Sequence, residues 1–217
     1  MEDAAGQSWQ APCDEELMLW LGRGDMQAFE CLLRRHRTQV VHFLYRMVQD
    51  REAAEELAQE VFLRVYRARC RYRPTARFTT WLYRIATNLA LNWLRHERRC
   101  GKPCSLEDLG RPGEMPRSAE QPSVEEVLWR RAQAERVRRA VAALPSRQRA
   151  VVLLHKYQGM DYEQIAATLG CSVQAVKSLT FRAYANLRRA LAPVASEGPS
   201  AVRPQPHLAF LLQGQVG

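Results

Sequence analysis

Apolar residues recur along the chain at spacings of three and four, and no segment sustains a two-residue alternation. This spacing places apolar side chains on one face of a helix, whereas alternation would indicate a strand. Two stripes are well defined, one formed by Ala54, Leu57, Ala58, Val61, Phe62, Val65 and Ala68, the other by Phe78, Trp81, Leu82, Ile85, Leu89 and Trp93. The pattern predicts an all-α protein.

Proline and glycine divide the helical pattern into two small domains. Seven of the residues from Cys100 to Ser123 are Gly or Pro, a composition typical of a flexible linker. The first domain is expected to contain three or four packed helices. The second is expected to break at Pro145 and to resume over Ser146–Tyr157, with Gly159 ending that helix. The predicted units are an N-terminal extension (1–13), two helical domains (14–100 and 124–192), a linker (101–123) and a C-terminal tail (193–217).

Charge adds two candidate polyanion-binding surfaces to this picture. The 217 residues include 32 Lys+Arg and 23 Asp+Glu, a net charge of +9, and nearly all of the basic residues are Arg. Residues 67–99 carry nine Arg and one Glu, and residues 127–192 carry 12 basic and three acidic side chains, whereas residues 14–66 and 100–126 are each −3. Because Arg donates bidentately to phosphates and base edges, nucleic acid is the expected partner.

Several other function classes find little support in the sequence. The longest apolar runs contain five residues, too few to span a bilayer, and the first ten residues carry no export signal. We therefore expect a cytoplasmic protein without membrane insertion. The Cys and His residues have no catalytic neighbours in sequence, so we expect neither an enzyme nor a cofactor. The six cysteines are expected to be free thiols, and the one local cluster that could hold zinc, a weak candidate without a fourth ligand, is His96, Cys100 and Cys104.

The segment Tyr162–Leu179, YEQIAATLGCSVQAVKSL, has the spacing of a helix-turn-helix. Asp161 and Gln164 form a capping-box pair, and Gly170 supplies the turn conformation. Ala166 is the small residue where the two helices approach each other. The apolar residues expected to be buried between the helices are Ile165, Leu169, Val173 and Val176. A generic helical hairpin shares these positions but does not need basic surroundings, so DNA binding is favoured. The residues of the second helix that can reach bases or phosphates are Gln174, Lys177, Ser178, Phe181 and Arg182. The two cations among them, Lys177 and Arg182, are also consistent with an ordinary solvated surface.

The helix predicted over Phe78–Arg95 follows an Arg-rich approach and presents a second candidate surface. At 100° per residue, Arg84, Asn88 and Arg95 fall within about 40° of one another. Cations, an amide and aromatic rings on one surface suit single-stranded nucleic acid, in which bases stack on rings. The alternative is core packing of the aromatic residues, which is favoured for Trp93, while for Tyr72 both roles remain open. The candidate residues are Tyr72, Arg77, Trp81, Arg84, Asn88 and Arg95.

The preceding helix, predicted over Glu52–Arg67, has the opposite charge in its first half, with Glu52, Glu55, Glu56, Gln59 and Glu60. Acidic residues near a helix N-terminus interact favourably with the helix dipole, which is a purely structural explanation. An acidic face on a basic nucleic-acid binder is also a docking surface for a protein partner. Composition does not decide between the two.

Two parts of the chain resemble bacterial RNA polymerase sigma factors. The runs AAEELAQEVFLRVYR, from Ala53, and FTTWLYRIATNLALNWLRHERR, from Phe78, resemble sigma region 2. The run LPSRQRAVVLLHKYQGMDYEQIAATLGCSVQAVKSLTFRAYANLRRAL, from Leu144, resembles region 4. Two such domains with no third domain between them are similar to the extracytoplasmic-function, or group IV, subfamily. The resemblance implies a region 2 helical bundle followed by a region 4 helix-turn-helix.

The resemblance also implies a partner for each surface. In the family, the acidic surface binds the clamp helices of the largest subunit of core RNA polymerase, which assigns Glu56, Gln59 and Glu60. The following loop and helix recognise and melt the minus-ten promoter element, with a flipped base held near the positions of Tyr72 and Asn88. The minus-thirty-five element would contact Lys177, Ser178, Phe181 and Arg182. Leu179 stands where the family commonly has Arg, which puts one backbone contact and upstream-element specificity in doubt. An anti-sigma protein is a further implied partner.

The sequence therefore predicts an alternative sigma factor that binds core RNA polymerase, directs it to promoters and promotes DNA melting. A free-standing helix-turn-helix regulator, which would act as a dimer, is the alternative. It is expected to carry a dimerisation element and a ligand or receiver domain, and neither is recognisable in the sequence. A third hypothesis is a zinc-dependent sensor built on His96, Cys100 and Cys104, which metal analysis would distinguish from the other two.

Overall fold

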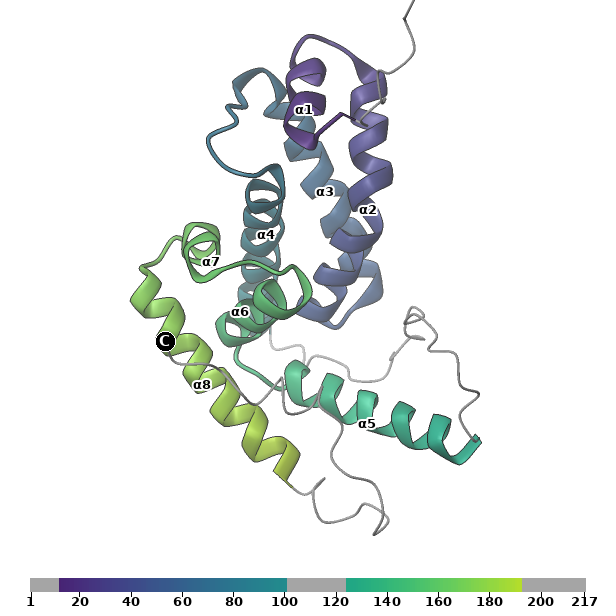
Figure 1. Cartoon of the computed structure of the whole chain (residues 1–217), viewed down its shortest axis with the longest axis vertical. Helices are drawn as coiled ribbons and strands as arrows, with labels where there is room; N and C mark the ends of the chain where they lie inside the picture. The colour runs from purple at the N-terminus through teal and green to yellow at the C-terminus, as the bar shows by residue number, and fades with distance from the viewer. Residues whose placement is uncertain (1–11, 101–123, 193–217) are drawn as a thin grey trace, which may run out of the picture.

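The computed structural model describes residues 12–100 and 124–192, and within these ranges the chain is helical, with no strand. Figure 1 shows the helices in two groups that meet along α4. The first group contains α1 (Asp14–Gly22), α2 (Met26–Val48), α3 (Arg51–Arg67), the 3-10 turn η1 (Arg69–Arg71) and α4 (Phe78–Cys100). The second contains α5 (Val124–Ala142), α6 (Ser146–Tyr157), α7 (Tyr162–Leu169) and α8 (Val173–Leu191). The all-α prediction is confirmed, and the linker and tail predicted at 101–123 and 193–217 lie outside the described residues.

Local capping sets the boundaries of the first bundle. Asp25 accepts hydrogen bonds from the backbone amides of Gln27 (2.9 Å) and Ala28 (3.3 Å), and α2 begins directly after it. The same helix ends at Gln49, which adopts the left-handed conformation at φ 61°. Asp50 then caps α3 by accepting from the amide of Ala53 at 2.9 Å. The two longest helices before η1 are thus joined by two residues and pack as an antiparallel pair.

The helix-turn-helix forms as its sequence signals predict. Asp161 and Gln164 make both hydrogen bonds of the capping box at the start of α7. Gly170 ends α7 at φ 61°, a conformation that side chains with a Cβ rarely adopt. Ser172 caps α8 by accepting from the amide of Ala175 at 3.2 Å. The prediction that Val173 is buried between the helices is wrong, because it is 37% exposed at the first turn of α8, before the two helices come into contact.

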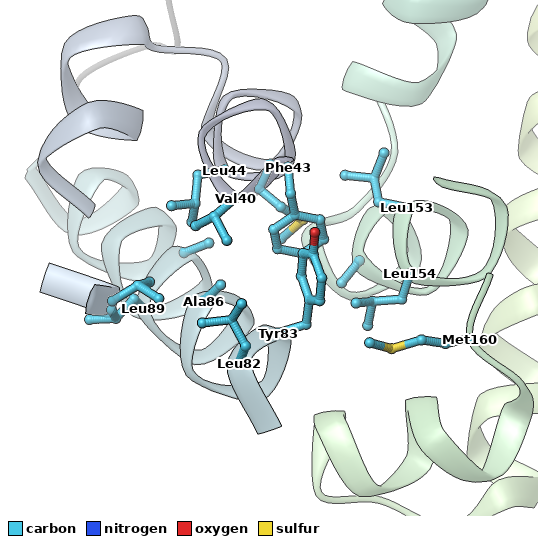
Figure 2. Packing of buried hydrophobic residues seen from close by; sticks show 14 of the residues in the cluster. Val40, Phe43, Leu44, Leu82, Tyr83, Ala86, Leu89, Leu153, Leu154 and Met160 are labelled. Atoms are coloured by element: carbon cyan, nitrogen blue, oxygen red, sulfur yellow. The ribbon is translucent and has the colours of Figure 1, made fainter. Parts of the chain in front are cut away.

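The two groups share one continuous core. The ring of Tyr83 on α4 lies between Phe43 on α2, whose ring centroid is 5.1 Å away, and the side chains of Leu154 and Met160 from the second group (Figure 2). α7 packs along α4, and α6 contacts both α2 and α4. The apolar contact therefore extends across both groups, as Figure 2 shows for Leu153 and Leu154 opposite Val40 and Leu82.

Two Arg side chains make polar contacts between the two groups. The buried guanidinium of Arg149 on α6 donates to the carbonyl of Met47 in the last turn of α2. It also donates to the carbonyls of Ala142, the last residue of α5, and of Leu144. The guanidinium carbon of Arg46 on α2 lies 4.4 Å from the ring centroid of Tyr157 at the end of α6. The carbonyl of Met47, at the end of α2, is thus satisfied by a side chain from the other group. Among the described helices, none is long and apolar enough to cross a membrane.

Candidate nucleic-acid interface

The second helix of the helix-turn-helix presents its predicted contact residues to solvent. The inner side of α8 is buried through Val176, Thr180, Ala183 and Leu187. The opposite side carries four exposed residues and the half-buried Ser178, and its most exposed large apolar residue is Phe181, at 76%. A helix of this kind fits the major groove, where amides and cations reach base edges and an apolar ring can meet a thymine methyl group. The five residues that share this surface are Gln174, Lys177, Ser178, Phe181 and Arg182.

The face of α4 predicted to bind nucleic acid is also formed. Arg84, Asn88 and Arg95 are exposed along one side of the helix, and Trp81 is half-buried at its edge. The buried side of α4 carries Leu82, Leu89 and other apolar residues that pack in the core. Arg77 is exposed in the loop just before the helix. The structure therefore brings the candidate residues of each domain together, as two separate faces on α4 and α8.

Tyr72 differs from the other candidates because its side chain is buried. It is 6% exposed, and its ring centroid lies 5.1 Å from that of Trp81 and 6.4 Å from that of Phe78. Burial raises the pKa of Tyr72 to about 12, and the carboxylates of Glu15 and Asp14 add to the effect. Of the two roles left open by the sequence, the packing role is the one present in this conformation. The ring stands behind Trp81 and supports it.

The acidic face of α3 is exposed and includes an apolar residue that sequence reasoning missed. Glu56 and Gln59 are exposed, and the carboxylate of Glu60 pairs with Arg64 at 2.7 Å. Leu63, 41% exposed, lies seven residues after Glu56 and so falls on the same face. That spacing was the available signal, but the residue was assigned to neither apolar stripe. Both explanations of this acidic face, the helix dipole and a protein partner, are compatible with its exposure.

The candidate zinc ligands are only partly described. The Cys100 Sγ atom lies 3.3 Å from His96 Nδ1 at the end of α4, beside a surface hollow of 280 Å³ lined by Asn92, Arg95, His96, Arg99 and Cys100. Cys104 lies outside the described residues, and within them no group of three potential metal ligands is assembled. A thiol and an imidazole alone do not make a zinc site, which takes four ligands when it is structural.

The structure also connects residues that the sequence analysis did not single out. Glu15 on α1 accepts a hydrogen bond of 2.6 Å from the amide of Phe78, the first residue of α4. Asp14 pairs with Arg35 at 2.9 Å and with His36 at 2.7 Å, both on α2. Contacts between residues 21 to 63 positions apart leave no local sequence signal.

Family models match both domains of the chain. The model described as Sigma-70 region 2 matches residues 32–100, and the model described as Sigma-70, region 4 matches residues 134–187. The first match covers α3, η1, α4 and most of α2, and the second covers the helix-turn-helix and the helix before it.

Curated relatives extend over most of the chain. CarQ, an RNA polymerase sigma factor of Myxococcus xanthus, is 37% identical over 77% of this chain and 91% of its own length. The ECF RNA polymerase sigma factor SigE of Mycolicibacterium smegmatis is 34% identical over 91% of this chain and 76% of its own length. The RNA polymerase sigma-H factor of Pseudomonas aeruginosa is 32% identical over 85% of this chain and 96% of its own length.

Two solved structures share the fold. CnrH, solved in complex with the cytosolic domain of CnrY, aligns with a TM-score of 0.60 at 23% identity, covering 85% of this chain and 99% of that one. The sigma factor RpoE of Bartonella quintana, solved with the anti-sigma factor NepR, aligns with a TM-score of 0.56 at 20% identity, covering 76% of this chain and 96% of that one. With both domain models matched in order and relatives above 30% identity along most of the chain, this protein belongs to the extracytoplasmic-function group of RNA polymerase sigma factors, the alternative initiation subunits that direct the polymerase to promoters.

Proposed function

We propose that this chain binds core RNA polymerase through α3, reads and melts the minus-ten element with α4 and the loop before it, and contacts the minus-thirty-five element with α8. The observation that carries the proposal is the presence of three exposed faces of different chemistry on one chain. One is acidic with an apolar residue, one combines Arg, Asn and Trp, and one is a basic recognition helix. Each face suits a different partner surface.

The proposed polymerase contact consists of Glu56, Gln59, Glu60 and Leu63. Gln59 is exposed and Glu60 keeps one carboxylate edge occupied by Arg64, so the acidic residues can reach basic side chains of a partner without rearranging α3. Leu63 adds an apolar centre to a charged rim, the arrangement that protein interfaces favour. The partner assigned to this face is the pair of clamp helices of the largest polymerase subunit.

The proposed minus-ten contact consists of Trp81, Arg84, Asn88 and Arg95, with Arg77 at its upstream edge. The exposed cations follow one side of α4 and can lie along a single-stranded backbone, while Asn88 offers both a donor and an acceptor to a base edge. Trp81, backed by the buried Tyr72, is the ring on which an unstacked base can rest. Tyr72 thereby acts behind the contact surface, through its packing against Trp81.

The proposed minus-thirty-five contact uses Gln174, Lys177, Ser178, Phe181 and Arg182 on α8. Gln174 lies at the first turn, where recognition helices reach base edges, and Arg182 lies two turns later, where a cation meets phosphate. Leu179 is half-buried and packs against the core, so it offers no charged group to the DNA backbone at that position. The upstream contact should therefore depend more heavily on Lys177 and Arg182.

The same proposal covers catalysis, location and control. The chain supplies contacts and DNA distortion, while the polymerase carries out the chemistry, so no enzymatic activity of its own is assigned. Because its proposed partners are RNA polymerase and promoter DNA, the chain is assigned to the cytoplasm. The RpoE structure with its anti-sigma factor supports an anti-sigma protein as a further partner. A free-standing regulator is not favoured, because both the region 2 and region 4 models match in order.

In vitro transcription tests the proposal directly. Core polymerase with and without the chain is given sheared genomic DNA from the source organism, and the templates that yield chain-dependent transcripts are sequenced. Permanganate footprinting on these templates then reports unpaired thymines. We expect melting near the start site only when both proteins are present. Tight promoter binding by the chain alone, with no melting in the presence of core, would instead establish the free-standing regulator.

Two variants assign the DNA contacts within that assay. Asn88→Ala should leave core affinity unchanged and slow promoter opening, and unchanged opening would remove Asn88 from the contact surface. Arg182→Ala should weaken upstream binding about five- to tenfold, the usual effect of removing one phosphate or base contact. The difference in affinity between this variant and the wild type should shrink as salt is raised. The variant makes one phosphate contact fewer, so it releases fewer counterions and its binding depends less on salt.

A further inference from the structure

Helix α1 contacts both ends of the segment that joins α3 to α4. At one end, Gly22 lies so close to η1 that a Cβ at this position would be 3.0 Å from the carbonyl oxygen of Arg69. At the other end, a carboxylate oxygen of Glu15 accepts a 2.6 Å hydrogen bond from the amide of Phe78. Arg71, Arg73 and the other exposed residues of this loop lie between these two points.

Glu15 acts as the N-cap of α4 from another helix. The first amides of a helix have no partner within the helix, and a capping side chain usually comes from the residue just before it. Here Arg77 stands just before Phe78 and its side chain has no acceptor to offer. The carboxylate of Glu15 fills that role and adds a negative charge at the positive end of the helix dipole.

α1 is itself fixed to α2, so its hold on α4 is rigid. Asp14 pairs with Arg35 at 2.9 Å and with the nearly buried His36 at 2.7 Å, and Arg35 also donates to the carbonyl of Pro12 at 2.7 Å. The apolar side of α1 is buried through Leu17, Met18 and Leu21. The ring of His36 lies 5.3 Å from that of Phe78, which closes the connection from α2 to α4.

We infer that α1 positions the start of α4 and the loop between η1 and α4 (residues 72–77), and that it does so through Glu15. The inference rests on the proposed function, because that function assigns the loop and helix to the minus-ten element. The matched region 2 model begins at residue 32, so α1 falls outside it. Tyr72 and Phe78, both buried, hold the loop ends, and the exposed residues between them take their geometry from these anchors.

Limited trypsin digestion measures this role without reference to promoters. Trypsin can cleave after Arg71, at the end of η1, and after Arg77, just before α4, and both residues are exposed. Glu15→Ala should raise the cleavage rate at these sites about fivefold, the change in a local opening equilibrium produced by losing a helix cap of ordinary strength. Glu15→Gln keeps the acceptor oxygen and should restore most of the protection. Glu30→Ala, which removes the same charge from an exposed position on α2, should cleave like wild type.

Core binding and promoter opening, measured on the same variants, separate positioning from simple destabilisation. Glu15→Ala should bind core polymerase with wild-type affinity but open promoters about fivefold more slowly at saturating core, with Glu15→Gln near wild type. A weakened core affinity, unchanged cleavage, or unchanged opening despite faster cleavage would each overturn the inference. If the wild-type chain opens no promoter, the proposed function fails instead, and the cleavage rates still decide whether Glu15 holds the loop.

Discussion

The contact between Arg46 and Tyr157 gives a direct measure of how strongly the two domains dock. Arg46 lies on α2 and Tyr157 at the end of α6, so the pair joins the domains without belonging to the core of either. Replacing Arg46 by Ala removes a guanidinium 4.4 Å from the ring centroid. Because Tyr157 is 47% exposed, the contact belongs to the solvated class, worth about 0.5–1 kcal/mol.

That energy corresponds to about a two- to fivefold larger population of undocked molecules. Hydrogen exchange followed by mass spectrometry should report it as faster exchange in α7 and in the side of α4 that α7 covers. The acidic face of α3 should exchange at the wild-type rate, since no contact there changes. α7 and α4 are suitable reporters because they form the most extensive packing between the domains.

A double-mutant cycle isolates the pair from other effects of each substitution. Arg46→Ala, Tyr157→Leu and the double variant are compared by the exchange of α7 amides. A coupling energy of about 0.5–1 kcal/mol is expected, so the second substitution should add little once the first is made. Fully additive single effects, or no change in α7 exchange in any variant, would refute the assignment of this contact to interdomain docking.

Three further predictions concern the partner face, the core and alkaline pH. Gln59→Ala with Glu60→Ala should weaken core binding about tenfold in a fluorescence titration, while urea unfolding changes by only about 0.5 kcal/mol because the pair with Arg64 is solvated; unchanged core affinity would remove α3 from the interface. Tyr83→Phe should stabilise the protein by about 1 kcal/mol, because the buried hydroxyl of Tyr83 has no hydrogen-bond partner among the described residues, and a loss of stability in urea would contradict this. Burial raises the pKa values of Tyr72 and Tyr184 from 10 to about 12. Because the unfolded chain loses these protons at lower pH than the folded protein, thermal stability should fall as pH rises from about 10 to 12. A flat stability profile over this range would contradict the burial of both hydroxyls.

The features that the sequence predicted well are those with local causes. Asp161, Gln164 and Gly170 cap and end α7 through bonds and angles that involve only near neighbours, so their residue types are sufficient signals. The exposed faces of α4 and α8 follow from helical periodicity in the same way. The start of α4 at Phe78 was also predicted, although its cap comes from Glu15, 63 residues earlier, which no local pattern reveals.

Burial of individual side chains was the least predictable property. Tyr72 stands in an Arg-rich loop and is nevertheless buried, because Trp81 and Phe78 from the next helix fold back over it. Val173 fits the apolar stripe of α8 but remains exposed, because the helix crossing begins one turn later at Val176. In both cases the outcome depends on where a second element lies, which periodicity within one helix does not encode.

Docking of the two domains leaves all three proposed contact faces exposed, so it blocks none of them. What docking limits is the distance between the face on α4 and the face on α8. The two promoter elements are centred about 25 base pairs apart, or roughly 85 Å along B-form DNA. A compact body of the size described here has a radius of gyration of about 15 Å. The docked chain is therefore too small to place α4 and α8 on both elements at once. Under the proposed function, contact with both elements at once requires the contacts of Arg149 with Met47 and of Arg46 with Tyr157 to break, and binding to the polymerase then supplies the energy. Arg46→Ala should accordingly bind core at least as tightly as wild type, and a weaker affinity would mean that the domains remain docked in the complex.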